Sequence, residues 1–251
     1  MEEMLSGDDL APYRVPPLGS CWWCGNDGPL THEHKFKKAD LKRMWGDGPA
    51  PVWGDSTRMR PIKSAQRSKD VRFTPGLCAP CNNARSQPFD RAYDVFSGFL
   101  WHRPSVYNGD VLDLSDVYGE NWSTQTRLLV GYLAKHIASR MAHDGYQIPA
   151  SLPAFLNGAD RIGDVEIVLF KSREIHQRES ELDRNGIDGR SLQLLPAVGR
   201  ASRSRRQLEM YCSGLTISSV GVMYRWNLGA TEANSFHHQR QPPLHWYHDL
   251  A

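Results

Sequence analysis

The fold of this chain depends on two short stretches of its sequence, Cys21-Trp22-Trp23-Cys24-Gly25 and Leu77-Cys78-Ala79-Pro80-Cys81-Asn82. Each contains two cysteines separated by two residues, a spacing that lets both thiolates project from one tight turn. Two such turns can close a tetrahedral zinc site with Zn–S bonds of about 2.3 Å. We therefore expect Cys21, Cys24, Cys78 and Cys81 to hold a structural Zn²⁺, with a set of reduced, buried thiols as the alternative.

The composition is that of a globular protein without a membrane segment. The 251 residues are 40% hydrophobic and 23% charged, and no apolar run approaches the length of a membrane span. The N-terminus is acidic and lacks the basic-then-apolar order of a signal peptide. We therefore expect a cytoplasmic protein, in which paired CxxC motifs indicate metal binding rather than disulfides. The fifth cysteine, Cys212, lies in an apolar stretch and is expected in the core.

Positive charge is concentrated between residues 35 and 72. The whole chain has a formal net charge of +2, whereas this segment carries eleven basic and four acidic residues, a net charge of +7. The basic residues are Lys35, Lys37, Lys38, Lys42, Arg43, Arg58, Arg60, Lys63, Arg67, Lys69 and Arg72. Such a cluster favours contacts with the phosphates of a nucleic acid, although a solvated basic surface explains it equally well.

A candidate catalytic motif lies between the cysteine pairs. Thr31-His32-Glu33-His34-Lys35 follows the first pair, and Asn82 comes directly after the last cysteine. The order CxxC, then an acid followed by His, then LCxxCN resembles that of zinc-stapled HNH endonucleases, over residues 20–95. The resemblance implies an N-terminal ββα-metal module of the treble-clef type, in which the second cysteine pair opens a helix.

The resemblance also implies a role for each residue of the motif. In this family an acid directly precedes the general-base histidine at the end of the first strand, and these positions match Glu33 and His34. The residue after the last cysteine completes the metal site and matches Asn82, and a basic residue three positions later matches Arg85. The residues expected to contact nucleic acid are Lys35, Lys37, Lys38, Arg72 and Arg85.

These residue types suit phosphodiester hydrolysis, which needs an activated water and positive charge at the leaving oxygen. Mg²⁺ or Mn²⁺ prefers oxygen ligands, which the Glu33 carboxylate and the Asn82 side-chain carbonyl can supply. The imidazole of His34 can accept the proton of the attacking water. Because adjacent residues of a strand point to opposite faces, Glu33 and His34 can converge only where the strand is bulged or ends.

Neighbouring residues compete for two of these roles. His32 is an alternative general base, but the acid stands directly before His34. Asn83 is an alternative metal ligand, but the position after the cysteine favours Asn82.

We divide the chain into a flexible lead-in over residues 1–20, a nuclease domain over 21–103 and a C-terminal domain over 104–251. In the nuclease domain, residues 87–103 predict a helix, with an apolar side that consists of Phe89, Tyr93, Phe96 and Leu100. The C-terminal domain is expected to be a small α+β unit with a long helix and an antiparallel hairpin. The overall fold class is therefore α+β.

The elements of the C-terminal domain follow from its hydrophobic pattern. Ser123 or Thr124 can cap a helix that runs to about His143 and ends at Gly145. Residues 164–170 predict a strand, and residues 208–226 predict a hairpin that turns at Ser213-Gly214. The apolar stripe of the helix consists of Leu129, Leu133, Ile137 and Met141.

The leading hypothesis is a metal-dependent HNH endonuclease that acts on DNA, in a setting such as phage defence or a mobile element. The C-terminal half would add substrate recognition, a protein partner or an oligomer contact. The alternative is a zinc-stabilised nucleic-acid-binding module with weak or no cleavage, because two positions depart from the family pattern. Phe36 stands where many members have Pro, and Phe73 where many have the Asn that orients the catalytic loop. A third hypothesis, a protein–protein adaptor, leaves His34 without a role.

Overall fold

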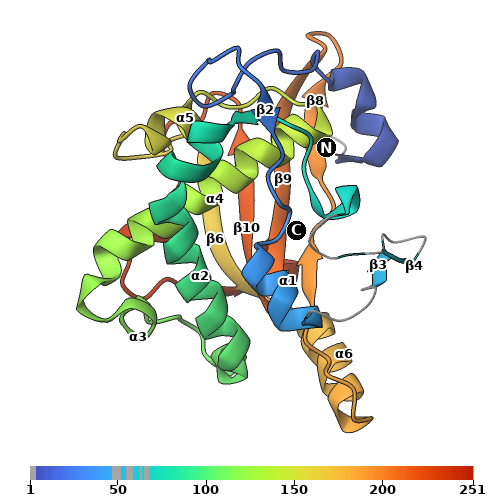
Figure 1. Cartoon of the computed structure of the whole chain (residues 1–251), viewed down its shortest axis with the longest axis vertical. Coiled ribbons are helices and arrows are strands. Elements are labelled where there is room, and N and C mark those ends of the chain that lie inside the picture. The colour runs from blue at the N-terminus through green and yellow to red at the C-terminus, as the bar shows by residue number, and fades with distance from the viewer. Residues whose placement is uncertain (1–3, 47–51, 55–58, 63, 65–67, 251) are drawn as a thin grey trace.

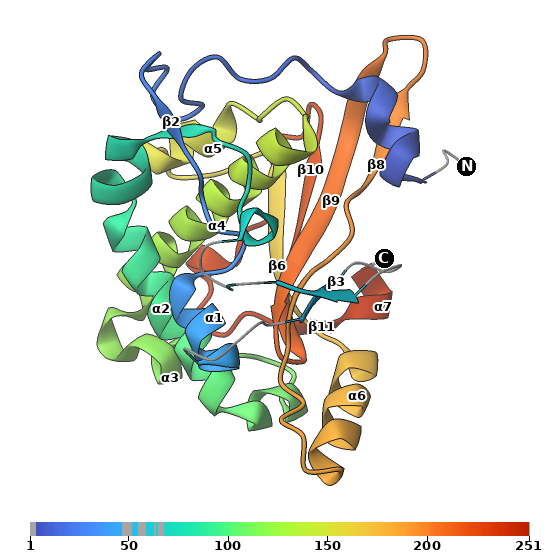
Figure 2. The same cartoon turned by 45° about the vertical axis from the view of Figure 1, so that its right-hand side comes forward.

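A mixed sheet lies behind a layer of helices in the computed structural model of this chain (Figures 1 and 2). The structure describes residues 4–46, 52–54, 59–62, 64 and 68–250. Within these ranges the sheet has seven strands, in the order β1-β8-β9-β10-β6-β11, and β7 pairs with β9. The pairs are antiparallel except β11 and β6, which are parallel. The strands are β1 Leu5–Ser6, β6 Val165–Lys171, β7 Leu192–Leu194, β8 Val198–Ser202, β9 Gln207–Ile217, β10 Val220–Asn227 and β11 Leu244–Trp246.

Helices α2 to α5 lie on one face of the sheet, and α7 packs against the other face (Figure 2). The expected α+β class is therefore confirmed. No helix in the described part of the chain has the length and apolar character that crossing a membrane requires. The helices are α1 Lys38–Trp45, α2 Gln87–His102, α3 Leu114–Tyr118, α4 Trp122–Asp144, α5 Ser151–Leu156, α6 Arg173–Arg184 and α7 Tyr247–Leu250.

Two short antiparallel pairs lie outside the large sheet. Strand β2 (Leu30–Thr31) pairs with β5 (Leu77–Cys78), and β3 (Val52–Gly54) pairs with β4 (Met59–Pro61). After β5 the chain forms a helical turn over Cys81–Arg85 and continues into α2. Glu33 and His34 therefore follow the first strand of the β2–β5 pair, and Asn82 lies in the helical turn after the second.

Helix α4 is buried on nearly every side. Its predicted apolar stripe is buried, and so are the polar residues Lys135, His136 and Ser139. Gly145 ends the helix with a φ of 87°, a left-handed conformation that favours glycine, as the sequence predicts. A helix with polar residues buried at its centre must supply them with partners from other segments.

The predicted N-cap of α4 is wrong. The helix begins at Trp122 with Asn121 as its N-cap, so Ser123 and Thr124 lie inside the first turn. The reason is that a 3₁₀ turn over Gly119–Asn121 leads directly into the helix, and its backbone replaces a side-chain cap.

The hairpin turns later than the sequence predicts. Ser213 and Gly214 lie inside β9, and the two-residue turn that joins β9 to β10 consists of Ser218 and Ser219. Ser218 has the positive φ, 58°, that tight hairpin turns require. Gly214 instead permits a close approach of strands, because a Cβ there would lie 2.5 Å from the carbonyl oxygen of Val222.

The predicted segments share one hydrophobic core. A single cluster of buried apolar residues includes Cys21 and Tyr93 from the first hundred residues and Leu133 from α4. Helices α2 and α4 pack closely at Gly131. A Cβ at this position would lie only 2.6 Å from the ring of Phe89, so the absence of a side chain permits the contact. How the chain divides into folding units stays a prediction.

The lead-in also contacts the C-terminal half. Strand β1 pairs with β8, and Leu10 in the 3₁₀ helix Gly7–Tyr13 is buried in the shared core. Backbone pairing and a buried leucine thus join residues 5–13 to the sheet, and the flexibility of the lead-in stays a prediction.

His136 links α4 to the catalytic motif. Its Nε2–H donates to the carbonyl oxygen of Lys35 at 3.0 Å, and the edge of its ring meets Phe73. Burial lowers the pKa of His136 to about 4. The imidazole is therefore neutral at physiological pH.

Replacing His136 with Gln should make the fold less sensitive to acid. The unfolded chain takes up a proton at this position as the pH falls through 6.5, whereas the folded chain does so only near a pH of about 4. Stability attributable to the neutral imidazole is complete above pH 6.5 and declines below it, by roughly 2 kcal/mol at about pH 5. Urea unfolding at pH 7.5 and at pH 5 should show a larger loss for the parent than for His136→Gln, whose amide can still donate to Lys35. An equal loss in both proteins would contradict the prediction.

Candidate functional site

The four cysteines of the two motifs lie together. Their sulfur atoms are all within 4.8 Å of one another, and Cys24 Sγ is 3.6 Å from Cys78 Sγ. A tetrahedron with Zn–S bonds of about 2.3 Å has sulfurs about 3.8 Å apart. The cluster is therefore consistent with a structural Zn²⁺, as the sequence predicts, and all four cysteines are free of disulfides.

Backbone geometry holds each cysteine pair. In the first pair, the N–H of Gly25 donates to the carbonyl oxygen of Cys21 at 2.8 Å, and Gly25 has a φ of 74°. The N–H of Cys21 in turn donates to Asn26. In the second pair, Cys78 ends β5 and Cys81 begins the following helical turn.

The surroundings act on the thiols of the cluster in different directions. Burial raises the pKa of the Cys21 thiol, but backbone N–H donors at Cys78, Cys24 and Trp23 outweigh this effect and bring it down to about 7. Burial and the neighbouring thiols of Cys24 and Cys78 raise the pKa of Cys81, although the Arg85 guanidinium donates to Cys81 Sγ at 3.3 Å and acts in the opposite direction. Because zinc binds the deprotonated sulfur, the lowered pKa of Cys21 favours metal binding.

Arg85 is directed toward the cysteines rather than toward the cleft described below. Besides Cys81, it donates to Asn157 Oδ1 at 2.7 Å and lies 4.5 Å from the centre of the Trp23 ring. Trp23 Nε1 donates to the same oxygen of Asn157. The predicted phosphate contact of Arg85 stays a prediction, and its position here indicates a role beside the zinc site.

Beyond β2 the chain stays paired with the segment before β5. The N–H of Phe73 donates to the carbonyl oxygen of Glu33 at 2.8 Å, and the N–H of Lys35 donates to Val71 at 2.8 Å. The regular strand nevertheless ends at Thr31. Glu33 and the residue after it therefore follow a strand end, which is the irregularity that their convergence requires.

The two departures from the family pattern are core positions. Phe36 and Phe73 are each only 1% exposed. Phe36 packs with Leu41 and Val71, and Phe73 lies against the rings of His136 and His143. Hydrophobic packing thus holds this loop at the two positions where the sequence departs from the HNH pattern.

A cleft of about 690 Å³ opens beside the loop. It is lined by all three predicted catalytic residues, Glu33, His34 and Asn82. The first two follow β2, and Asn82 follows β5. Three of the five predicted nucleic-acid contacts line it as well, and these are Lys37, Lys38 and Arg72.

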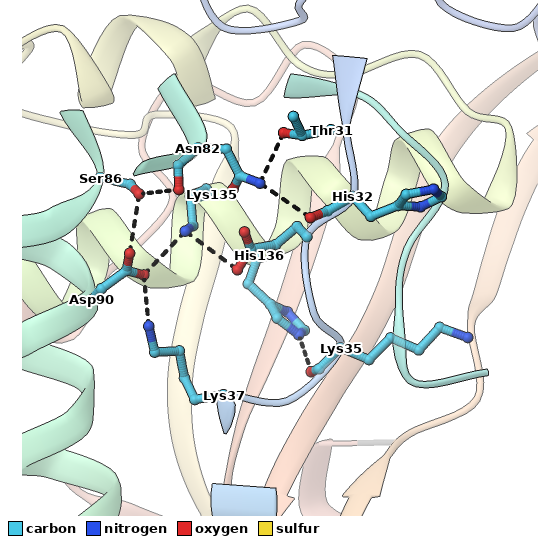
Figure 3. A network of polar contacts seen from close by, with 10 residues as sticks. Thr31, His32, Lys35, Lys37, Asn82, Ser86, Asp90, Lys135 and His136 are labelled. Carbon is cyan, nitrogen blue, oxygen red and sulfur yellow. Dashed lines mark hydrogen bonds and ion pairs between the residues drawn. The ribbon is translucent and has the colours of Figure 1, made fainter. Parts of the chain in front are cut away.

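Lys35 is not among the described residues that line this cleft. The side chain of Lys35 extends away from Asp90 and Lys135, as Figure 3 shows. Arg58, Lys63 and Arg67 of the basic segment lie outside the described residues.

Asn82 is fixed in one orientation. Its Nδ2 donates to Thr31 Oγ1 at 3.0 Å and to the carbonyl oxygen of His32 at 3.1 Å (Figure 3). Its Oδ1 is buried and has no hydrogen-bond partner. A buried carbonyl oxygen without a partner is costly unless a ligand pairs with it. The adjacent Asn83 is used differently, because its Nδ2 donates to the backbone of Ala79.

The two histidines of the motif also differ. The Nδ1 of His32 lies 2.8 Å from the carbonyl oxygen of Phe73, and the ring points away from Asn82 and Lys135 (Figure 3). Both histidines line the cleft, and the backbone of His34 pairs with Arg72. The preference for His34 over His32 as the general base stays a prediction.

A cluster of charges lies beside Asn82. The Nζ of Lys135 is 3.3 Å from Glu33 Oε1 and 3.0 Å from Asp90 Oδ1, and Lys37 Nζ is 3.2 Å from the same oxygen of Asp90 (Figure 3). Ser86 Oγ lies 3.0 Å from the other Asp90 oxygen, Oδ2. Burial raises the pKa of Glu33, while the Lys135 ammonium acts in the opposite direction.

Sequence reasoning missed Lys135 and Asp90. Lys135 is 1% exposed. The sequence pattern predicts that it lies in a long helix but does not predict that its side chain is buried at the site. A signal was present, because Lys135 interrupts an otherwise apolar run in that helix. Asp90 follows Asn82 and Ser86 at four-residue steps, a spacing that puts all three on one helix face.

Substituting one cysteine of the cluster should remove the metal and destabilise the fold. Cys78→Ser leaves three thiolates, and structural zinc sites contribute folding energy directly. Zinc content should fall from one ion per chain to well below one, and the free energy of unfolding should fall by several kcal/mol. Cys212→Ser is the matched control, because Cys212 is buried in a different cluster and should leave zinc content unchanged. Full zinc retention by Cys78→Ser would refute the site.

Comparison with known proteins adds no family to this picture: no family model, no curated protein and no solved structure matches the chain. The functional interpretation therefore rests on the residues and the geometry described above.

Proposed function

We propose that this chain is a metal-dependent endonuclease of the HNH type, with a ββα-metal module that hydrolyses phosphodiester bonds in DNA. The observation that carries the proposal is the shared cleft of Glu33, His34 and Asn82. Glu33 and His34 are adjacent, Asn82 lies 48 positions after His34, and the three residues have the types and order that phosphodiester hydrolysis by this family requires.

The donor set of the cleft fits a hard divalent ion. Asn82 offers a buried carbonyl oxygen without a partner, held in place by Thr31 and His32. Glu33 offers a carboxylate, and the ion pair with Lys135 is made through its Oε1. Oxygen ligands of this kind suit Mg²⁺ or Mn²⁺. When bound, such an ion supplies positive charge at the scissile phosphate and at the leaving oxygen.

The remaining roles belong to side chains around the cleft. His34 is the general base, which accepts the proton of the attacking water. Lys37, Lys38 and Arg72 lie in the lining and supply positive charge for the phosphates of the substrate. The buried Phe73 holds the backbone of Glu33 and so keeps the carboxylate at the cleft.

A nucleic-acid-binding module without cleavage is the second candidate. It is favoured by the ion pair between Lys135 and Glu33, because the ammonium already neutralises the carboxylate that a metal would use. Phosphate binding by the basic lining would persist in such a module, so binding alone does not separate the two candidates.

Loss of the His34 imidazole should abolish cleavage. Incubation of plasmid DNA with the zinc-loaded chain and Mg²⁺ or Mn²⁺ should produce nicked or linear DNA, and His34→Ala should slow this by about 100-fold or more. His32→Ala is the matched control, since it removes a neighbouring imidazole but keeps the carbonyl that holds Asn82. Absence of cleavage by the parent, with DNA binding intact, would favour the binding module instead.

Loss of Lys38 should weaken DNA binding without changing its sequence preference. One phosphate contact removed should reduce the slope of log K against log salt concentration by about one. Arg184→Ala on α6, an exposed cation away from the cleft lining, is the control for net charge. Fluorescence anisotropy over a series of salt concentrations, with DNA of two different sequences, measures the affinity, the slope and the sequence preference. Equal slopes for Lys38→Ala and the parent would exclude this contact.

A further inference from the structure

The buried ammonium of Lys135 lies behind the cleft rather than in it. Glu33 and Asp90 line the cleft, and Lys135 reaches both carboxylates from α4, on the buried side. With a side chain 1% exposed, it does not contact a molecule in the cleft. Its effect on a ligand must therefore pass through the two carboxylates.

Lys135 is held on several sides. Besides the two carboxylates, the ring of Tyr132 lies 5.6 Å from its Nζ. A buried ammonium that loses its partners is strongly destabilising, because nothing replaces the lost hydration. The ammonium should therefore stay between Glu33 and Asp90 when a divalent ion binds in the cleft.

We propose that Lys135 is a fixed cation of this site, which bridges Glu33 and Asp90 from behind and weakens the binding of the divalent ion in the cleft. The inference rests on the proposed function and makes Lys135 a positioning residue. It also gives the C-terminal half a defined part in the site, since α4 supplies the residue.

The charges of the cluster explain the weak binding. Two carboxylates, Glu33 and Asp90, form ion pairs with two ammonium groups, Lys135 and Lys37. These ammonium charges offset the two negative charges that a divalent ion would otherwise meet. The Asp94 carboxylate also lines the cleft, and so do the cations Lys38 and Arg72.

Mn²⁺ titration of the zinc-loaded full chain, followed by the electron paramagnetic resonance signal of free Mn²⁺, tests the proposal without measuring activity. The parent should bind one Mn²⁺, and Lys135→Met should bind Mn²⁺ at least about tenfold more tightly, because one positive charge near the ion is gone. Lys135→Arg keeps the charge and should stay within about twofold of the parent. Lys171→Met is the matched control, since Lys171 is also a buried lysine but pairs with Asp110 and Gly109 instead.

An affinity in Lys135→Met equal to that of the parent would overturn the inference. If Lys135→Met fails to fold, Lys135→Gln removes the same charge but keeps a hydrogen-bond donor, and the same comparison decides the matter. Glu33→Gln separates this inference from the proposed function. If it leaves Mn²⁺ binding unchanged, or the parent binds none, the proposed function and the inference both fail. If Glu33→Gln weakens binding but Lys135→Met does not strengthen it, only the inference about Lys135 fails.

Discussion

A buried positive charge constrains the arrangement of this molecule. An ammonium removed from water costs several kcal/mol unless carboxylates surround it, and Lys135 obtains these from Glu33 and from Asp90 on α2. Three segments that are far apart in the sequence must therefore meet at one point. The next residue on α4, His136, holds the backbone of Lys35. Helix α4 is in this way the scaffold on which the loop after β2 and the start of α2 are aligned.

The cysteine cluster provides a second constraint at the other end of the same strand pair. It joins the turn after Cys21 to the end of β5, and it sets where the helical turn with Asn82 begins. Zinc prefers sulfur ligands, and magnesium or manganese prefers oxygen ligands. Under the proposed function, ligand chemistry alone would therefore separate the structural metal at the cysteines from the metal in the cleft.

Local patterns in the sequence predicted the parts of the structure that depend on local chemistry. The cysteine spacing predicted the cluster, and the helix that ends at Gly145 follows from its apolar stripe and from a glycine with positive φ. The hairpin was placed wrongly because Ser213-Gly214 has the composition of a turn, while the strand register places the turn at Ser218. Register depends on pairing with a distant strand, which a local pattern does not contain.

The same distinction applies to the site. Glu33, His34 and Asn82 were found because they stand beside one another or beside a cysteine. Lys135 was not, because its partners lie 45 and 102 positions before it, and a lysine in a helix is usually solvated. Phe36 and Phe73 depart from the HNH pattern in the sequence, and their burial shows that both side chains serve the packing of the core.

The contact of Phe89 with Gly131 has a consequence for any attempt to shorten this protein. A chain that stopped after α2 would leave Phe89, Tyr93 and Phe96 facing water, since α4 covers that side of the helix. An exposed apolar face of this kind promotes aggregation. The segment that contains the cysteines and lines the cleft is thus not expected to fold by itself. A fusion of this segment to another protein would have to include α4 and the sheet on which α4 packs.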